Sequence, residues 1–452
     1  MPTRLIESLA TTAALAEVFS DESVLQAMLD FEAALARAEA RVGIVPKQAA
    51  DAITSAAQAS QFDIPEISRG TYRAGTAAIP LVKALRERVK KRNSDAPAWV
   101  HWGATSQDVV DTALVLLLKR SLPILVRDLQ RLDQALAGLS ERHKDSVMLG
   151  RTLMQPAPPV TFGLKAAGWL GAQRRDGERL KSAFAEAMVV QFGGASGTLA
   201  SLGERGLEVA RALAEELALR YPEAPWHSHR DRLASVVCCC GVLTGSLGKM
   251  ARDISLLMQN EAAEVAEPGG EGRGGSSTMP HKRNPIACAL TLAAAERTPG
   301  LIASFLSAMV QEHERGVGSW QSEWPLIASV IQATGSAASS MAETAEGLSV
   351  DVARMRQNIQ NTRGLIFAEK AMMLLAPKLG RDVAHQLLER AARESVTKQK
   401  HLSKVLAEMP EVASRVEPSI LERLAIPEQY LGCAEAFRQA LLRGNTLKKQ
   451  EP

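Results

Sequence analysis

Five long apolar segments, rich in small residues, most constrain the fold of this chain. Their apolar residues recur at helical spacing, and they lie near 106–143, 158–188, 231–262, 286–313 and 324–348. A helix of about 30 residues is ~45 Å long, which exceeds what a small domain of one subunit needs. Gly163 and Gly168 in the second segment and Gly241 in the third let neighbouring backbones approach closely. These segments predict one long helical bundle that other subunits complete.

The rest of the chain also has helical patterns, without sustained period-two alternation, so the predicted fold class is all-α. Residues 21–42 form a predicted helix with Asp21 as the N-cap and Gly43 as the residue that ends it. A chain of 452 residues is too long for one simple core. We expect a central five-helix bundle flanked by two smaller helical domains, with boundaries at 1–105, 106–350 and 351–452.

Composition excludes several classes of function. The chain has 53 Lys and Arg against 50 Asp and Glu, and this balance does not favour nucleic acid as a partner. The N-terminus lacks the apolar core of a signal peptide, and the longest apolar run, 113–118, is far shorter than the ~20 residues of a membrane span. The five cysteines have apolar or helical surroundings, typical of buried free thiols. We therefore expect a cytoplasmic protein without a membrane or nucleic-acid partner.

One long irregular segment, residues 267–285, interrupts the helices and is rich in Gly and Pro. Its second half places Ser276 and Ser277 shortly before Lys282 and Asn284. A Ser hydroxyl is a poor base at its free pKa and needs nearby positive charge and oriented N–H donors to ionise. Lys282, Asn284 and a Gly-rich backbone supply such groups. The alternative, a flexible linker, leaves the rigid and cationic second half unexplained.

A polar cluster at residues 101–108 precedes the first long segment. In one interpretation it only caps the helix, with Thr105 or Ser106 as the N-cap and Asp108 in the first turn. In the other, the free N–H groups of the helix start bind a carboxylate. His101 then joins Thr105 and Ser106 as a candidate substrate contact.

Two further clusters lie at helix ends. Gln155, in the segment 150–159, either contacts an anionic substrate or caps the second helix. Arg315 suits a bidentate contact with a carboxylate, although Arg near a helix C-terminus also complements the helix dipole. His227 and His229 lack a Cys, Asp or Glu at metal-ligand spacing, so we expect no metal site there.

Together these clusters resemble a known family. Residues 274–285, Gly-Gly-Ser-Ser-Thr-Met-Pro-His-Lys-Arg-Asn-Pro, are similar to the signature of the fumarase/aspartase superfamily. Residues 103–108 and 150–155 resemble its two other signature regions, in the right order, and the resemblance covers nearly the whole chain. It implies an all-α homotetramer with active sites shared between subunits. It also implies a cofactor-free reaction in which a proton is removed α to a carboxylate and a β leaving group departs.

The same resemblance implies roles for individual residues. Ser276 would be the catalytic base, while Lys282 and Asn284 would stabilise the charged intermediate. The implied substrate contacts are His101, Thr105, Ser106, Gln155, Ser277 and Arg315.

Position 153 departs from the pattern of the C–N lyases in this superfamily. Adenylosuccinate and argininosuccinate lyases carry His there, which is associated with a nitrogen leaving group, whereas this chain has Leu153. A carboxylate leaving group, with a pKa near ~4, needs no general acid. Leu153 therefore favours the branch that lactonises 3-carboxy-cis,cis-muconate, a tricarboxylate, in protocatechuate degradation, although Trp is expected at this position in that branch. Segments 190–197 and 311–315 also resemble that branch.

Two alternatives remain. An adenylosuccinate lyase or related C–N lyase is disfavoured by Leu153. It is also disfavoured because the segment between Ser68 and Lys83 contains no His, Asp or Glu. A non-catalytic helical scaffold is disfavoured by the complete set of Ser276, Lys282 and Asn284, which a scaffold does not require.

Overall fold

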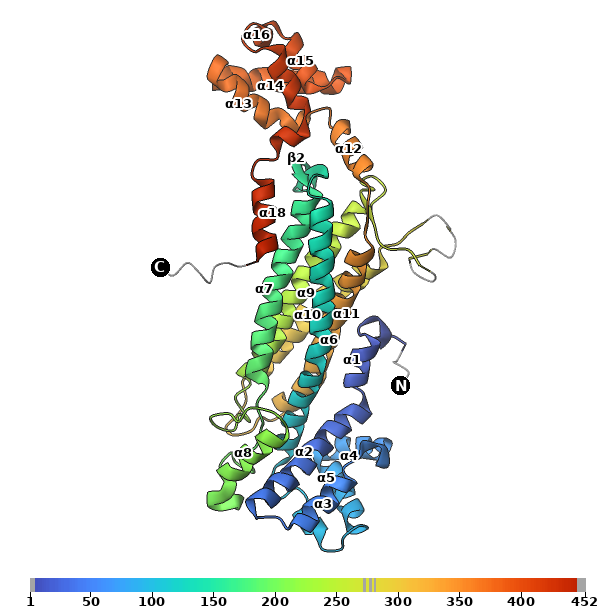
Figure 1. The fold of residues 1–452 in the computed structure, drawn as a ribbon, viewed down its shortest axis with the longest axis vertical. Coiled ribbons are helices and arrows are strands. Elements are labelled where there is room, and N and C mark those ends of the chain that lie inside the picture. Colours follow the sequence, from blue (N-terminus) through green and yellow to red (C-terminus); the bar gives the residue numbers. More distant parts are fainter. Residues whose placement is uncertain (1–4, 271–273, 276–278, 280–281, 445–452) are drawn as a thin grey trace. The chain divides into compact units, whose positions relative to one another are not determined.

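The computed structural model describes residues 5–270, 274–275, 279 and 282–444, and it is built almost entirely of α-helices (Figure 1). The helices before the bundle are α1 (Ala13–Val18), α2 (Asp21–Val42), α3 (Lys47–Ala56), α4 (Ile64–Ala74) and α5 (Ala78–Lys90). The next helices are α6 (Ser106–Arg142), α7 (Phe162–Ala187), α8 (Gly206–Glu216), α9 (Asp231–Leu257), α10 (Ile286–Ala308) and α11 (Ser319–Gly347). The last helices are α12 (Val352–Asn361), α13 (Ala368–Leu379), α14 (Arg381–Lys398), α15 (Leu402–Glu408), α16 (Pro410–Ala413), α17 (Pro418–Glu422) and α18 (Ala434–Arg443).

The five long helices are confirmed, with corrected ends. The second begins at Phe162 instead of 158, because residues 155–161 pair with a preceding strand. Helices α9 and α10 end earlier than expected, at Leu257 and Ala308, and α11 begins five residues earlier, at Ser319. The chain is therefore mainly α-helical, with little sheet.

Two small antiparallel sheets were not predicted. Strands β1 (Val147–Thr152) and β2 (Gln155–Thr161) form a hairpin, while β3 (Val265–Ala266) pairs with β4 (Ser349–Val350).

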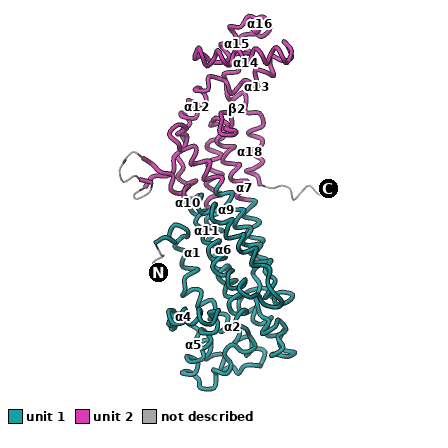
Figure 2. The backbone as a smooth tube through the Cα atoms, turned by 180° about the vertical axis from the view of Figure 1, so that it is seen from behind, with its two compact units in different colours: residues 1–130, 175–248, 290–340 teal, residues 131–174, 249–289, 341–452 magenta. Residues whose placement is uncertain are grey.

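The chain divides into two compact units, each assembled from three separate segments (Figure 2). Unit 1 contains residues 1–130, 175–248 and 290–340, and unit 2 contains 131–174, 249–289 and 341–452. The long helices pass from one unit into the other, so these units do not follow sequence order as the three expected domains do. The three-domain division stays a prediction.

Helix α2 is buried along most of its length in unit 1, where it packs against α3 and α8. Its N-cap is Ser20, whose hydroxyl accepts the N–H of Ser23 at 3.2 Å, so the expected cap at Asp21 was wrong by one residue. Asp21 instead lies in the first turn, where a carboxylate complements the helix dipole. Gly43 ends the helix as predicted, at a φ of 84° that favours glycine.

Glycines bring α9 and α10 together in unit 1, as the sequence predicted for Gly241. A Cβ added at Gly241 would lie 2.1 Å from Cδ1 of Ile302, and one at Gly248 would lie 2.6 Å from Cβ of Ala295. Helices α9 and α10 are also long and apolar enough to span a membrane by length and composition alone. The most apolar stretch of α9 is 56% buried within the chain, as in a core helix. The corresponding stretch of α10 is only 28% buried. Helix α10 therefore leaves much apolar surface uncovered in a single chain.

The hairpin and the C-terminal helices form separate hydrophobic clusters in unit 2. Val147 and Leu149 of β1 pack with Ile359, Ile366 and Phe367. Helices α13 to α17 share a second cluster, which includes Leu375, Leu406 and Leu424.

All five cysteines are free, but they are not all buried as expected. Cys238 and Cys239 are partly exposed, and Cys433, which precedes α18, is exposed.

Gly163→Ala tests the close approach of α7 to the end of α6. A Cβ at Gly163 would lie 2.6 Å from the carbonyl oxygen of Ser140 and 2.7 Å from Cα of Lys144, so the backbone must move. We expect the free energy of unfolding to fall by about 1–3 kcal/mol. Gly168→Ala is the control, because among the described residues of one chain a Cβ at Gly168 meets nothing within 4 Å, contrary to the close approach expected there. Ala also favours the helix. Equal unfolding curves for the two variants in urea would contradict this packing.

Candidate active site

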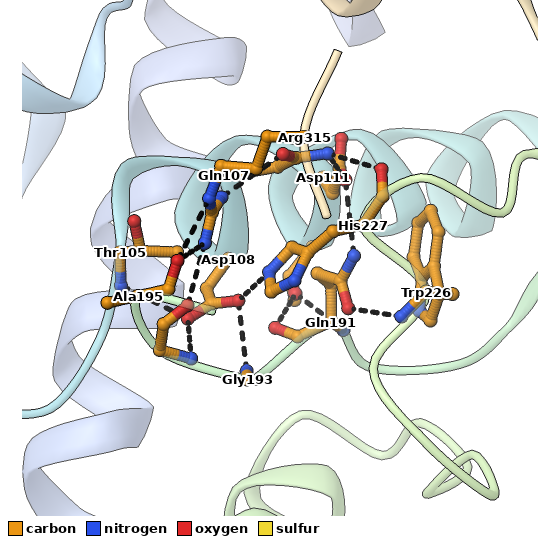
Figure 3. Close-up of polar contacts among 12 residues, drawn as sticks. Thr105, Gln107, Asp108, Asp111, Gln191, Gly193, Ala195, Trp226, His227 and Arg315 are labelled. Atoms are coloured by element: carbon orange, nitrogen blue, oxygen red, sulfur yellow. Dashed lines mark hydrogen bonds and ion pairs between the residues drawn. The ribbon is translucent and has the colours of Figure 1, made fainter. Parts of the chain in front are cut away.

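The carboxylate of Asp108 holds the start of α6. It is completely buried, and its Oδ2 accepts the N–H groups of Thr105 at 3.1 Å and Gly194 at 2.9 Å. Its Oδ1 accepts the N–H of Gly193 at 3.0 Å and lies 2.7 Å from Nε2 of His227 (Figure 3). The bond to Thr105 is one of the two bonds of a capping box, in which a side chain of the first turn accepts the N–H of the N-cap residue. Asp108 therefore joins the helix start, the 193–194 loop and His227.

The helix start itself retains unused donors. Within the described residues, the backbone N–H groups of Ser106 and Gln107 have no hydrogen-bond acceptor, and neither do the hydroxyls of Thr105 and Ser106. Free N–H groups at a helix N-terminus, together with the helix dipole, favour bound anions. The geometry thus allows capping and carboxylate binding at the same helix start.

One turn further along α6, a second buried carboxylate takes part in an ion-pair cluster. Arg230 is 1% exposed, and its Nη1 donates to Oδ2 of Asp111 at 2.7 Å while its Nη2 donates to Oε2 of Glu323 at 2.6 Å. The Arg230 guanidinium also lies 4.9 Å from the centre of the Trp226 ring, and Nε1 of Trp320 donates to Oδ1 of Asp111 at 3.0 Å.

Electrostatic forces oppose one another in this cluster. Burial works to lower the pKa of Arg230, but Asp111 and Glu323 outweigh it, so the pKa is raised and the guanidinium stays charged. Burial raises the pKa of Glu323, and Arg230 counteracts that rise.

Arg315 is tied to the same region by several hydrogen bonds. Its Nη1 donates to Oε1 of Gln107 at 3.1 Å, and its Nη2 donates to the carbonyl oxygens of Gly194 at 2.7 Å and Ala195 at 2.8 Å (Figure 3). The structure therefore gives Arg315 a role in fixing the 194–195 loop beside the start of α6. Its expected contact with a substrate carboxylate stays a prediction.

His101 lies in the turn before α6 and contacts a buried acid. Its Nδ1 is 2.6 Å from Oε1 of Glu32, which belongs to α2. Burial works to lower the pKa of His101, but the charge and hydrogen bond of Glu32 outweigh it and the pKa is raised.

In unit 2, the second signature region is the turn of the β1–β2 hairpin. Leu153 and Met154 form this turn with φ of 50° and 65°, and the side chain of Leu153 is 97% exposed. Gln155 follows directly and is also exposed. Arg151, on the other side of the turn, forms a bidentate ion pair with the buried Glu264, at 2.9 and 2.8 Å. This ion pair fixes the strand from which the turn projects.

In the Gly-rich segment 267–285, Gly274 and Asn284 are hydrogen-bonded to each other. The N–H of Asn284 donates to the carbonyl oxygen of Gly274 at 2.8 Å, and Gly274 has a φ of 69°. The backbone N–H of Lys282 donates to the carbonyl oxygen of Met279 at 3.0 Å, and the side chain of Lys282 is exposed. Ser276 and Ser277 lie outside the described residues.

Glu267 caps α10, the helix that follows this loop. Its two oxygens accept the N–H groups of Ala287 at 3.1 Å and Cys288 at 2.8 Å. Burial, followed by the contact with Glu267, raises the pKa of the Cys288 thiol.

The expected site residues divide between the two units. Unit 1 contains His101, Thr105, Ser106 and Arg315, and unit 2 contains Gln155, Lys282 and Asn284. Within the described ranges, no group of three or more His, Cys, Asp or Glu side chains is placed to hold a metal ion.

Sequence reasoning identified Asp108 only as an acid in the first turn of a helix, and it did not find Asp111 or Glu32. Asp108 and Asp111 lie three residues apart among the valines of an apolar helix, and Glu32 lies among alanines and leucines of α2. Acids on an apolar helical stripe are the signal that could have identified them, because charged residues are rarely buried unless they are paired.

Arg230→Met tests the buried ion-pair cluster. The substitution leaves Asp111 and Glu323 buried beside one another without a cation, so we expect the free energy of unfolding to fall by ~3–5 kcal/mol. Lys47→Met removes the exposed ion pair with Asp51 and should cost less than ~1 kcal/mol. Losses of equal size in chemical unfolding would show that the cluster does not stabilise the fold.

Comparisons with known proteins agree with this architecture. Residues 8–300 match the family described as Lyase, and residues 364–441 match the family described as adenylosuccinate lyase C-terminus. The chain is 48% identical to the 3-carboxy-cis,cis-muconate cycloisomerase of Pseudomonas aeruginosa, over 97% of this chain and 96% of that protein. It is 46% identical to the corresponding enzyme of Bradyrhizobium diazoefficiens, over 97% of each chain.

A solved structure is similar over the same extent. The 3-carboxy-cis,cis-muconate lactonizing enzyme from Pseudomonas putida superimposes with a TM-score of 0.92 at 46% identity, covering 98% of both chains. The chain therefore belongs to this lyase family, the fumarase/aspartase superfamily.

Proposed function

We propose that this protein is a 3-carboxy-cis,cis-muconate cycloisomerase, which closes its substrate to 4-carboxymuconolactone in protocatechuate catabolism. The observation that carries this proposal is the similarity, over 97% of the chain, to cycloisomerases of that name. Leu153 supports it independently, because Leu cannot donate a proton and a reaction that forms or breaks a C–O bond to a carboxylate needs no donor there.

The reaction follows from the chemistry of the substrate. One carboxylate oxygen adds to a conjugated C=C bond and forms the C–O bond of the lactone. The electron pair of that double bond moves to the carbon α to a second carboxylate, which becomes an aci-carboxylate. Ser276 protonates this carbon. In the reverse direction Ser276 acts as the base that removes the same proton. Lys282 and Asn284 stabilise the negative charge of the intermediate.

The substrate carries three carboxylates, whose desolvation must be offset by donors and cations. The unused N–H groups at the start of α6 and the hydroxyls of Thr105 and Ser106 offer such donors. His101 and Arg315 offer positive charge beside them. Gln155 and Ser277 complete the proposed set of contacts.

We also propose a cytoplasmic homotetramer with shared active sites, which requires no cofactor or metal and binds neither nucleic acid nor membrane. The poorly buried apolar surface of α10 supports self-association, since water-exposed apolar surface of this extent favours a protein partner. In this assembly residues 106–350 form the central bundle domain, flanked by the domains 1–105 and 351–452.

The alternatives are testable in one assay. Purified protein is mixed with 3-carboxy-cis,cis-muconate, and loss of the diene absorbance is followed. Turnover supports the cycloisomerase. Absence of turnover together with fumarate release from adenylosuccinate would establish the C–N lyase instead, and inactivity on both substrates would favour the scaffold.

Ser276→Ala tests the proposed proton donor. We expect kcat to fall by about 10²–10⁴-fold, because a general acid–base group is lost, while the thermal unfolding midpoint changes little. Ser277→Ala should mainly raise KM, because Ser277 is assigned to substrate binding. A near-normal kcat in Ser276→Ala would remove Ser276 from this role.

Gly274→Ala tests whether the closure of the loop matters for catalysis. At a φ of 69°, a Cβ would lie 2.9 Å from the carbonyl oxygen of Asn284, so the loop ends must shift. A displacement of about 1 Å lowers turnover on the order of a hundredfold. Gly275→Ala is the control, because a Cβ at Gly275 meets no described residue within 4 Å. The assignment is wrong if both variants turn over at the same rate.

A further inference from the structure

A buried carboxyl group of α2 lies against the turn that begins the candidate site. Glu32 is 1% exposed, and its Oε1 is 2.6 Å from Nδ1 of His101. Burial of a charged carboxylate is costly unless the group is paired. Its other oxygen, Oε2, has no hydrogen-bond partner within the described part of the chain. The His101 ring is therefore the main compensation for this buried acid.

We propose that Glu32 is a positioning residue that holds His101 as an imidazolium, so that His101 presents a positive charge and an Nε2–H donor to a substrate carboxylate. The proposal rests on the function proposed above, in which the substrate is a tricarboxylate. It gives α2, which lies outside the three signature regions, a part in substrate binding.

The backbone and the ring support this role together. His101 has a φ of 62°, an uncommon conformation for a residue other than Gly, and the contact of its Nδ1 with Glu32 fixes the direction of the ring. The ring is 16% exposed, with Nδ1 bound to Glu32. No residue in the described ranges accepts a hydrogen bond from Nε2. One nitrogen is thus anchored in the protein interior and the other is available to a ligand.

Charged groups from three elements act on the ring. Burial works to lower the pKa of His101, and the charge and hydrogen bond of Glu32 on α2 raise it. Asp108 on α6 raises it further, while Arg86 on α5 lowers it, and the net result is a raised pKa. Because the pKa is raised, the imidazolium persists above the ordinary value of 6.5 and is lost as the pH rises through the raised value. Glu32 therefore favours substrate binding between pH 6.5 and the raised pKa of His101.

A purely structural role is the competing explanation. In that case the pair only joins α2 to the turn before α6, and breaking it would lower stability without changing the pH dependence of substrate binding. Glu32→Gln separates the two explanations, because Gln keeps an acceptor for the Nδ1–H of His101 but removes the negative charge.

Glu39 provides a matched control on the same helix. It is completely buried, and neither of its carboxyl oxygens has a hydrogen-bond partner among the described residues. Burial, followed by the charge of Glu32, raises the pKa of Glu39 to about 9, so this side chain is neutral at pH 7. Glu39→Gln therefore changes a buried carboxyl group of α2 without removing a charge at pH 7 or a hydrogen bond.

Steady-state kinetics across pH test the proposal. For Glu32→Gln we expect KM for 3-carboxy-cis,cis-muconate to rise about tenfold between pH 6.5 and the raised pKa of wild-type His101, as one charged contact is lost, with kcat little changed. At a pH below the pKa of His101 in both the wild type and Glu32→Gln, the two enzymes should have similar KM, because His101 is then protonated in each. Glu39→Gln should follow the wild type throughout. A KM profile of Glu32→Gln that coincides with the wild type, or a loss confined to kcat, overturns the proposal.

Titration of the histidine ring signals by NMR gives a readout that needs no turnover. The His101 signal is assigned by its absence in His101→Gln. We expect its pKa to lie above 6.5 in the wild type and to fall in Glu32→Gln. A wild-type pKa at or below 6.5 overturns the proposal, even if Glu32→Gln does not fold. Failure of the wild type to convert the muconate would instead overturn the proposed function, while the titration still reports on the pair.

Discussion

The buried carboxylate of Asp108 is the interaction on which the start of α6 depends. Burying a carboxylate in the protein interior is costly unless its oxygens are compensated, and Asp108 achieves this with three backbone N–H groups and one imidazole. These partners come from three places in the sequence: Thr105, the Gly193–Gly194 loop and His227. Since all of them converge on one side chain, the position of the helix start is determined by the same bonds that satisfy the charge. The free N–H groups of Ser106 and Gln107 are then already ordered, so an anion that binds them does not have to order the backbone.

The second buried acid of α6 explains why the surrounding segments are equally well fixed. Asp111 lies one turn after Asp108 and is neutralised by Arg230, which also binds Glu323. Gln107 connects Asp111 to Arg315, which binds the 194–195 loop, because the side chain of Gln107 donates to Oδ2 of Asp111 and accepts from Arg315. Replacing any one of these groups leaves a partner buried without compensation. The polar interior is therefore rigid in the way that a carboxylate-binding site requires.

Sequence patterns predicted the helices well because a period of 3.6 residues is a local property. The hairpin was missed for equally local reasons. Its second strand contains Pro156, Pro158 and Pro159, which cannot donate ladder hydrogen bonds and are tolerated only where a strand is at an edge. Its turn has φ > 0 at Leu153 and Met154, where a sequence normally signals this turn with Asn or Gly.

The candidate site was predictable in part. Thr105, Ser106 and Asp108 follow from capping preferences at a helix start, and Gly274 from the flexibility of its loop. The partners of the buried acids were not predictable, since Glu32 and His101 are 69 positions apart, and Asp108 and His227 are 119 apart. Only the fold brings them together. A residue pattern shows that a buried acid needs a partner, but it does not identify the partner.

The geometry of the hairpin turn explains how chemistry can change at position 153 without disturbing the fold. Leu153 is almost fully exposed within its own chain, so its side chain contributes little to the packing of the hairpin. The strand before it is instead fixed by the bidentate pair of Arg151 with Glu264, which Asn358 also contacts at 2.8 Å. The strand is therefore held in place by residues other than the one at position 153. A substitution at this turn, whether of a proton donor or of an apolar group, therefore leaves the bonds that hold the hairpin and its neighbouring helix unchanged.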